Sequence, residues 1–330
     1  MVNANGNFKG IVPSGNVVDR LSLADLRQGL NDRLETALGE RFGKLDIVPL
    51  SSASDVEDGT TVSLLRNETG RSCAVILSAA PASPDMVRRA MSRARKAKLL
   101  LGPSLGLHIL DPLLEGNLCG LSYAVMPYCN SLSNFRPLWW VQRTMLCPSI
   151  FEWLRSVTEC TVRDIEQVDI ERKFIEPLRE VASFKLLGGS VRATAERAVE
   201  RLYNGEWSPK YVLMHSDFWK GNILIQPGVS AGEKQLWRDR FVIIDWPGSE
   251  MYGYAFFDLL RMSQSMRLNS KNLRKEVASH CQLLKCKKSD SMSYLLAALG
   301  HIAMNLEYFP VETYIHMAQA CVSTLEEVLD

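Results

Sequence analysis

Leucines recur at helical spacing close to the start of the chain and predict an amphipathic helix over residues 20–42. Ser22 and Asp25 open this segment in the pattern of a capping box, which is typical of a helix N-terminus. The helix is therefore expected to bury one leucine-rich face. The periodic positions are Leu21, Leu23, Leu26, Leu30, Leu34 and Leu38.

Short apolar runs then alternate with turn-forming residues up to position 126, a pattern that predicts an antiparallel sheet. Asn67-Glu68-Thr69-Gly70 reads as the turn of one hairpin, and Glu115-Gly116-Asn117 as the turn of a second. Between the two hairpins, Pro84 opens a basic helix that runs to about residue 101. The predicted strands cover residues 44–50, 60–66, 72–79, 109–114 and 121–126.

The remainder of the chain has mainly helical periodicity. Two apolar strands interrupt it between residues 211 and 246, and the polar stretch 226–240 between them is expected to be a surface loop. No internal repeat is found. The predicted helices cover residues 137–156, 161–184, 190–204, 255–268, 270–285, 290–306 and 310–329.

Composition fits a globular protein. The 330 residues are 46% hydrophobic and 23% charged, and the net charge of +1 gives no general attraction to nucleic acid or to an anionic membrane. The first seven residues are polar and lack a signal core, and no apolar run is long enough to span a membrane. The eight cysteines form no C-x-x-C pair, which favours reduced thiols and a cytoplasmic location.

The segment from Met214 to Ile225 carries the most specific chemistry. Asp217 and Asn222 lie five positions apart in a short loop, and an apolar strand follows them directly. Asp245 then ends a second apolar strand, Phe241–Ile244, so its carboxylate must project into a cleft or find partners. Phosphoryl transfer needs such a set, since one carboxylate faces the acceptor hydroxyl while an amide and a second carboxylate hold Mg²⁺.

The same residues resemble a known family. His215-x-Asp217 with Asn222-Ile-Leu, then Ile244-Asp245-Trp246, Gly253 and Asp258-Leu259 is similar to the pattern of the aminoglycoside phosphotransferase and choline kinase group, relatives of the protein kinases. The resemblance implies a two-lobed α+β fold. A small antiparallel-sheet lobe with one main helix, residues 1–126, would bind nucleotide, and a larger helical lobe, residues 127–330, would hold the catalytic and acceptor sites.

The resemblance also assigns roles. Asp217 would orient the acceptor hydroxyl, although a strand-end Asp can also cap the following turn. Asn222 and Asp245 would hold magnesium, although Gly-Asn is also a common loop dipeptide. His215 and Asp258 would support the shape of the catalytic loop.

Three further residues in these segments have two interpretations each. Lys220 could stabilise charge on the transferred phosphoryl group or be solvated. Trp219 and Trp246 could wall the acceptor pocket, although large apolar side chains are more often simply packed.

The segments that would bind the nucleotide depart from the family pattern. The strand 73–79 contains no Lys, and the helix 84–101 contains no Glu to pair with one. Met126 and Tyr128 would form the hinge beside the base, and Ser52 and Ser54 stand where a glycine-rich turn would cover the phosphates. One cation of the basic helix could replace the missing Lys, although most of these residues are expected to be solvated. The candidates are Arg88, Arg89, Arg93 and Lys96.

The sequence therefore predicts a kinase that uses Mg²⁺ and ATP or GTP to phosphorylate a hydroxyl of a small molecule, such as a sugar, an aminoglycoside-like compound or an amino alcohol. The missing Lys and Glu leave an alternative, a catalytically silent kinase-like module that binds a nucleotide, a metabolite or a protein. Only thirteen positions separate Asp245 from Asp258, which leaves little room to dock a peptide substrate.

Overall fold

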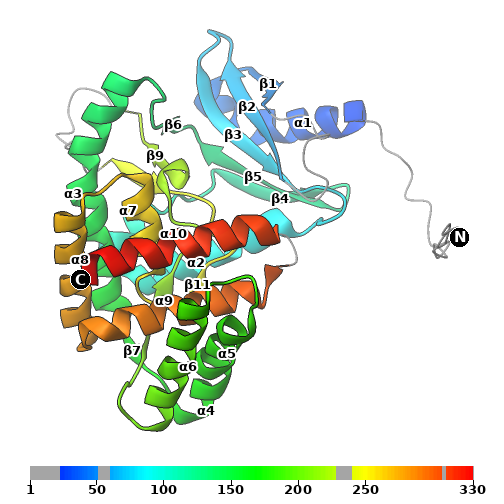
Figure 1. Ribbon diagram of the computed structural model, residues 1–330. Helices are drawn as coiled ribbons and strands as arrows, with labels where there is room; N and C mark the ends of the chain where they lie inside the picture. Colours follow the sequence, from blue (N-terminus) through cyan, green and yellow to red (C-terminus); the bar gives the residue numbers. More distant parts are fainter. Residues whose placement is uncertain (1–22, 51–59, 228–239, 307–309, 330) are drawn as a thin grey trace, which may run out of the picture.

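The computed structural model describes residues 23–50, 60–227, 240–306 and 310–329. Within these ranges a small antiparallel sheet with two helices is followed by a mainly helical part, as in the two lobes of a kinase (Figure 1). No helix in the described ranges is long and apolar enough to cross a membrane.

The sheet has the strand order β1-β2-β3-β5-β4, and every neighbouring pair is antiparallel. The two predicted hairpins and the basic helix are all present, as is the N-terminal helix from Leu23 onward. The bounds are α1 (Leu23–Phe42), β1 (Leu45–Pro49), β2 (Thr61–Asn67), β3 (Ser72–Ser78), α2 (Met86–Leu105), η1 (Gly106–His108), β4 (Leu114–Leu118) and β5 (Leu121–Pro127).

Strand β3 separates two environments because its alternate side chains point to opposite faces. Ala74 and Ile76 are buried in one cluster with Leu34 and Leu38 of α1. On the other face, Leu77 joins a second cluster, under α2, whose buried members are Ala79, Val87, Met91 and Ala124. The sheet is thus held between α1 and α2.

The second hairpin turns at a different place from the predicted one. Leu118 pairs with Leu121, and Cys119 and Gly120 form the turn with φ of 51° and 82°. Two positive φ values define the hairpin turn whose twist matches that of the strands. Gly116 lies instead inside β4, where the ring of Tyr123 occupies the space that a side chain would need. The predicted strand at 109–114 is also wrong. Strand β4 begins only at Leu114 and runs through residues 115–117, where the turn was predicted.

The helical part contains two further small sheets, β10-β9-β6 and β11-β8-β7. Its first elements are β6 (Asn130–Ser131), α3 (Arg136–Thr161), β7 (Arg163–Asp164), α4 (Gln167–Ile170), the π-helical turn η2 (Glu171–Ile175), α5 (Glu176–Ser183) and α6 (Gly189–Tyr203). The catalytic segment and the last helices are β8 (Lys210–Met214), η3 (Lys220–Asn222), β9 (Ile223–Ile225), β10 (Phe241–Ile243), β11 (Glu250–Gly253), α7 (Phe257–Ser265), α8 (Ser270–Leu284), α9 (Lys288–Ala303) and α10 (Val311–Leu329).

The single helix predicted at 161–184 is not formed. The Thr161 hydroxyl accepts a hydrogen bond from the Leu213 amide at 3.0 Å, and the next residues pair with β8 through Arg163↔Tyr211. Residues 163–164 are therefore extended, and the helical structure resumes only at Gln167.

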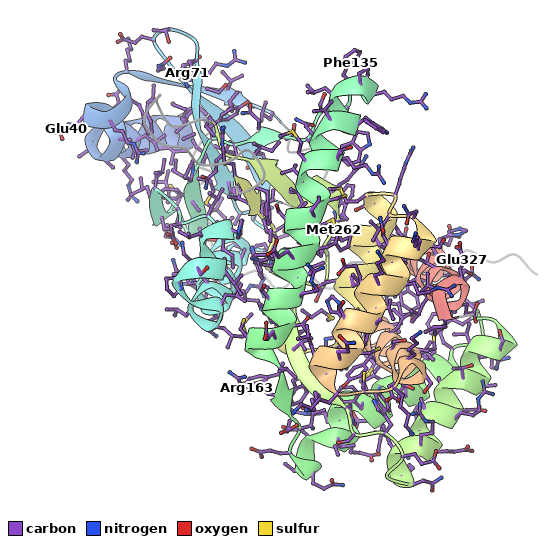
Figure 2. The ribbon with its side chains drawn as sticks, turned by 90° about the vertical axis from the view of Figure 1, so that its left-hand side faces the viewer. Glu40, Arg71, Phe135, Arg163, Met262 and Glu327 are labelled. Carbon is purple, nitrogen blue, oxygen red and sulfur yellow. The ribbon has the colours of Figure 1, made fainter. Side chains whose placement is uncertain are left out.

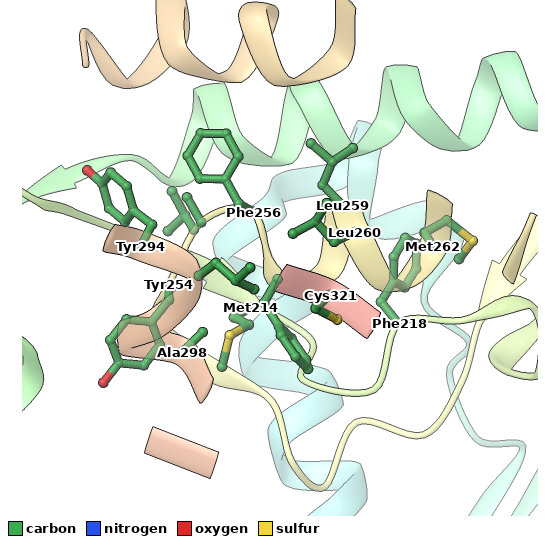
Figure 3. Packing of buried hydrophobic residues seen from close by; sticks show 14 of the residues in the cluster. Met214, Phe218, Tyr254, Phe256, Leu259, Leu260, Met262, Tyr294, Ala298 and Cys321 are labelled. Carbon is green, nitrogen blue, oxygen red and sulfur yellow. The ribbon is translucent and has the colours of Figure 1, made fainter. Parts of the chain in front are cut away.

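The large core lies in the helical part. Helix α9 is buried along most of its length, and Tyr294 packs there among rings from other elements at centroid distances of 5.2–6.2 Å. Residues of β8 and α7 belong to the same core, among them Met214, Leu259 and Leu260 (Figure 3). This core supports the loop that carries the candidate site.

Candidate active site

A two-stranded hairpin builds the site. Strands β9 and β10 pair antiparallel with Ile223 opposite Ile243, and the Ile244 amide donates to the Asn222 carbonyl at 3.1 Å. This pairing brings the end of the catalytic loop beside the residue that precedes Asp245. Two segments that are twenty residues apart in the sequence thus meet as the motif predicts.

Asp217 and Asn222 are in direct contact. The Asn222 side-chain amide donates to the Asp217 carbonyl at 2.8 Å and to the Asp217 carboxylate Oδ2 at 2.9 Å. Because both bonds use the amide nitrogen, they leave the amide oxygen of Asn222 for another partner. That oxygen accepts no hydrogen bond within the described residues, so it is a candidate metal ligand.

Asp245 follows β10 by two residues, has a left-handed backbone with φ 69°, and lines the same cavity between the lobes as Asn222. Burial of its carboxyl raises the pKa above the ordinary value, and the negative charge of Asp217 raises it further. Among the described residues it forms no ion pair. A divalent cation between these groups would relieve both effects.

Hydrogen bonds of Asp258 and His215 hold the catalytic loop in shape. The Asp258 carboxylate accepts from the backbone amides of His215 and Ser216 at 2.6 and 3.1 Å. His215 Nε2 donates to the Ile244 carbonyl at 2.9 Å, while Nδ1 accepts from the Asp217 amide at 3.3 Å. These contacts fix Ser216 at φ 74°, a conformation that costs free energy in a non-glycine residue.

Burial sets the protonation of both supporting groups. It lowers the pKa of His215 to about 4, so the imidazole is neutral near pH 7 and acts as a fixed donor and acceptor. Burial raises the pKa of Asp258 to about 7, against the opposing effect of the two backbone amides that it accepts from. Both side chains form hydrogen bonds with backbone groups, and this geometry agrees with the supporting roles that the resemblance implies.

Arg261 is a site residue that the sequence interpretation missed. It lies on α7, three positions after Asp258, and its Nη2 atom is 3.9 Å from Oδ1 of Asp217. Its Nε atom is buried and has no hydrogen-bond partner within the described part of the chain. The i, i+3 spacing from Asp258 was the one available signal, because residues at that spacing share a helix face.

Lys220 lies over the ring of Trp139, with Nζ 4.9 Å from the ring centroid, so α3 contributes to the mouth of the site. Trp219 precedes it in the loop and is partly exposed, and its ring lies against Gly221. Trp246 is buried, donates to the Ile243 carbonyl at 3.1 Å and packs on His215. This placement favours packing for Trp246, although one side of it also reaches the cavity.

The interlobe cavity has a volume of about 300 Å³ and lies between β3, α2, the hinge and the catalytic hairpin. Val75 and Leu77 occupy the positions on β3 where a Lys would be expected. No Lys, Arg or His is among the described residues that line it. The lining side chains are mostly apolar, and the polar ones are Thr60, Asn222 and Asp245.

The basic helix does not fill the gap left by the missing Lys. Arg88 pairs with Asp85 at 2.8 Å on the surface, and Arg93 binds the Ser249 carbonyl and the Glu250 carboxylate. Arg89 and Lys96 are exposed and do not line the cavity.

The hinge residues diverge. Met126 lines the interlobe cavity, whereas Tyr128 lines a separate surface hollow with Arg71 and Asn130. Ser52 and Ser54 lie outside the described residues. The structure therefore places Met126 in the cavity that Asn222 and Asp245 line, and Tyr128 outside that cavity.

Comparison with known proteins bears on the fold. No family model matches the chain, and no curated protein matches its sequence. Among solved structures, choline kinase LicA from Streptococcus pneumoniae is similar over 91% of this chain and 99% of its own, with 13% identity and a TM-score of 0.50. A protein assigned as a fructosamine-3-kinase from Haemophilus somnus matches over 91% and 97%, with 12% identity and a TM-score of 0.51.

The chain has the protein-kinase-like fold of small-molecule kinases. This confirms the fold class and the resemblance predicted from the motif. An identity of 12–13% establishes the fold and leaves the acceptor undetermined.

The donor set of this kinase-like site fits magnesium. The Asn222 amide oxygen and the Asp245 carboxylate are both hard oxygen donors at the cavity wall. Within the described residues no group of three His, Cys, Asp or Glu side chains could hold a metal ion by itself. The protein thus offers the partial ligand set that Mg²⁺ takes when phosphate oxygens complete its shell.

Proposed function

We propose that the protein is a Mg²⁺-dependent phosphotransferase that moves the γ-phosphoryl group of ATP or GTP to a hydroxyl of a small molecule. The observation that carries this proposal is the contact between Asp217 and Asn222 at the edge of a cavity that Asp245 also lines. A silent relative has no chemical need for all three groups in this arrangement.

Each residue has a defined task in this reaction. The acceptor oxygen bonds to the γ-phosphorus as the bond to the bridging oxygen of the nucleoside diphosphate breaks, and Asp217 takes the hydroxyl proton. Asn222 and Asp245 would hold magnesium, which neutralises charge on the phosphate oxygens when it is bound. Arg261, whose Nη2 atom is 3.9 Å from Asp217 Oδ1, and Lys220 would stabilise charge on the transferred group.

The cavity would take the nucleotide. Its apolar walls and its volume of about 300 Å³ suit a flat base, with Met126 at the hinge. We propose that residues 1–126 form the nucleotide-binding lobe and residues 127–330 the catalytic and acceptor-binding lobe. The eight cysteines are all unpaired, which supports a cytoplasmic enzyme.

The acceptor is proposed to be a sugar, an aminoglycoside-like compound or an amino alcohol. The similar structures bear the names of kinases for choline and fructosamine, and both compounds carry nitrogen and hydroxyl groups. Partly exposed Trp219 is well placed to contact such a compound beside Asp217.

A thermal-shift titration with ATP and GTP tests the site, with and without Mg²⁺. The wild type should gain stability in a magnesium-dependent manner, and Asp245→Ala should lose that gain. Asp46→Ala, on the exposed side of β1, is the matched control and should respond like the wild type. Magnesium-dependent stabilisation that survives in Asp245→Ala would contradict the metal-binding role.

The silent-module alternative rests on one observation, the lack of any cation among the described residues of the cavity wall. Such a module would bind a ligand and form no product. Hydroxyl-dependent formation of ADP or GDP by the wild type, lost in Asp217→Ala, would exclude it.

A further inference from the structure

Two cysteines meet at the end of α8, outside the candidate active site. Helix α8 packs beside α3 and α9 in the helical part of the molecule (Figure 2). Cys281 lies in the last turn of α8, and Cys286 lies two residues beyond its end. Cys281 is 6% exposed, and Cys286 is half-buried between the exposed Lys285 and Lys287. One thiol is thus covered by protein, and the other reaches the surface.

The backbone brings the two cysteines together. The chain leaves α8 through Lys285, which has a left-handed backbone with φ 54°. The Cys286 amide donates to the Cys281 carbonyl at 3.0 Å, and the Lys285 amide donates to the Gln282 carbonyl at 3.1 Å. These two bonds define a Schellman motif, in which the side chains at the first and last positions commonly touch. Here both of those positions are cysteine.

The two thiols are in hydrogen-bond contact. The Cys286 thiol donates to the Cys281 sulfur, and this bond lowers the pKa of Cys281. The positive charge of Lys288 acts in the same direction, whereas burial and the negative charge of Asp290 oppose it. The Cys281 Sγ atom also lies 3.8 Å from the Lys287 carbonyl oxygen, so the residues after Cys286 turn back toward it.

Burial has the opposite effect on other cysteines of this protein. It raises the pKa of Cys129, Cys147 and Cys321 to about 11. Because the thiolate is the form that attacks an oxidant, these three thiols are protected near pH 7. Cys281 is buried as well, but the neighbouring thiol favours its thiolate form.

We propose that Cys281 and Cys286 form a reversible oxidation site, in which hydrogen peroxide converts the two thiols into an internal disulfide. The Cys281 thiolate attacks one peroxide oxygen, the O–O bond breaks, and Cys281 becomes a sulfenic acid while the other oxygen leaves as water. The Cys286 sulfur then attacks the Cys281 sulfur and loses its proton, and the second oxygen leaves as water. Two thiols are oxidised, and one peroxide is reduced to two molecules of water.

The fold suits this step. A disulfide needs its two Cβ atoms within about 4.5 Å of each other, and the backbone bond between Cys286 and Cys281 holds these residues together. We therefore expect the disulfide to close within the native fold. In a reducing compartment the pair stays reduced until the oxidant concentration rises. The proposal does not depend on the phosphotransferase function, since neither thiol lines the interlobe cavity.

Peptide mapping of the full chain tests the proposal. The protein is treated with hydrogen peroxide, its remaining thiols are blocked with N-ethylmaleimide in denaturant, and the monomer band of a non-reducing gel is digested with trypsin. Trypsin cleaves after Lys285, between the two cysteines, so the disulfide links residues 276–285 to residues 286–287. Two of the eight thiols should be lost first, and dithiothreitol should restore both. The pair should oxidise at least about tenfold faster than Cys129.

Single variants separate the two thiols. Cys286→Ser keeps a hydroxyl donor beside Cys281 but cannot form the disulfide, so a sulfenic acid should accumulate at Cys281 and be trapped by dimedone. Exposed Cys119→Ser is the matched control and should form the disulfide as the wild type does. Thermal melts establish that both variants are folded. Were Cys286→Ser unfolded, the peptide maps of the wild type and of Cys119→Ser would still decide the result.

Four results would overturn the proposal. The linked peptides could be absent while exposed Cys119 is oxidised, or they could occur only in a covalent dimer. Cys281 could pair equally often with other cysteines, which would indicate oxidation of unfolded chains. Folded Cys286→Ser could also fail to gain a dimedone adduct at Cys281.

Discussion

The carboxylate of Asp217 has a different neighbour at each oxygen. Oδ2 accepts from the Asn222 amide, while Oδ1 points toward Arg261 and the mouth of the site. Asp217→Asn keeps the shape and removes the proton acceptor, so kcat should fall by about 10²–10⁴-fold while nucleotide binding is retained. Steady-state kinetics with a thermal-shift titration measure both effects. Turnover within a factor of a few of the wild type would contradict the role of Asp217.

At the scale of single residues, the sequence was informative about side chains that local structure brings together. The spacing of Asp217, Asn222 and Asp245 led to one contiguous site, because a short hairpin connects them. Trp139 could not be found in this way, since it reaches Lys220 from a helix some eighty residues away. The absence of a Lys from β3 could be read from the sequence, whereas the binding of Arg93 to the Ser249 carbonyl could not, because that turn is distant in sequence.

At the scale of elements, the approach of α9 to α5 depends on one glycine. A side-chain carbon added at Gly300 would lie 1.8 Å from the Pro177 carbonyl oxygen, so the two helices would have to separate. Gly300→Ala should lower the free energy of unfolding by about 1–3 kcal/mol or more. Denaturant unfolding of the variant measures this loss.

Gly39 provides the control for that prediction. It also lies within a helix, α1, but nothing within 4 Å would meet an added carbon. Gly39→Ala should therefore stabilise the protein, by about 0.5–1 kcal/mol. Equal effects of the two substitutions would mean that helix propensity, and not the contact with Pro177, decides the result.

Helices with strong periodicity were predicted well, whereas the breaks and turns between elements were not. Helices α8 and α10 match their predicted ranges closely because each has a continuous apolar face. The break after Thr161 was missed because it depends on hydrogen bonds to β8, which is distant in sequence. The β4–β5 turn was misplaced because Cys119 is an unusual residue for a positive φ, whereas Glu115-Gly116-Asn117 has ordinary turn composition.

At the scale of the whole molecule, stability should depend on pH through buried histidines. Burial lowers the pKa of His280 to about 4, and the ring bonds to the Glu276 carbonyl. A histidine whose pKa is depressed in the folded state contributes stability above its unfolded pKa, near 6.5, and that contribution is lost as the pH falls through 4. The loss for His280 amounts to roughly 3 kcal/mol.

His280→Gln should remove this term, so its stability relative to the wild type should rise as the pH falls from 6.5 to 4. Comparing the two proteins isolates His280 from Asp258, whose raised pKa acts in the opposite sense: its contribution is present below about 4 and is lost as the pH rises through 7. Exposed His316→Gln is the control. A difference between variant and wild type that does not change with pH would contradict the prediction.

The two lobes are joined beside Asp245 by Arg93, which binds Ser249 and Glu250 on the turn that follows the catalytic hairpin. This contact fixes α2 without the usual Lys and Glu. Arg93→Leu should weaken nucleotide binding by up to about fivefold, since a partly exposed ion pair contributes up to ~1 kcal/mol. Nucleotide titration measures it, and Arg89→Leu, one turn earlier on the exposed face, should have no effect.

Because the tryptophan rings differ in exposure, the intrinsic fluorescence of the protein can be used to follow ligand binding. Among the tryptophans that the structure describes, Trp140 is well exposed and Trp139 and Trp219 are partly exposed, whereas Trp153, Trp207 and Trp246 are buried. Of these described tryptophans, an aqueous quencher such as iodide therefore reaches Trp140 most readily, Trp139 and Trp219 less readily, and the three buried rings least. An acceptor bound beside Asp217 would shield Trp219, so a Trp219→Phe variant would identify that signal in a fluorescence titration.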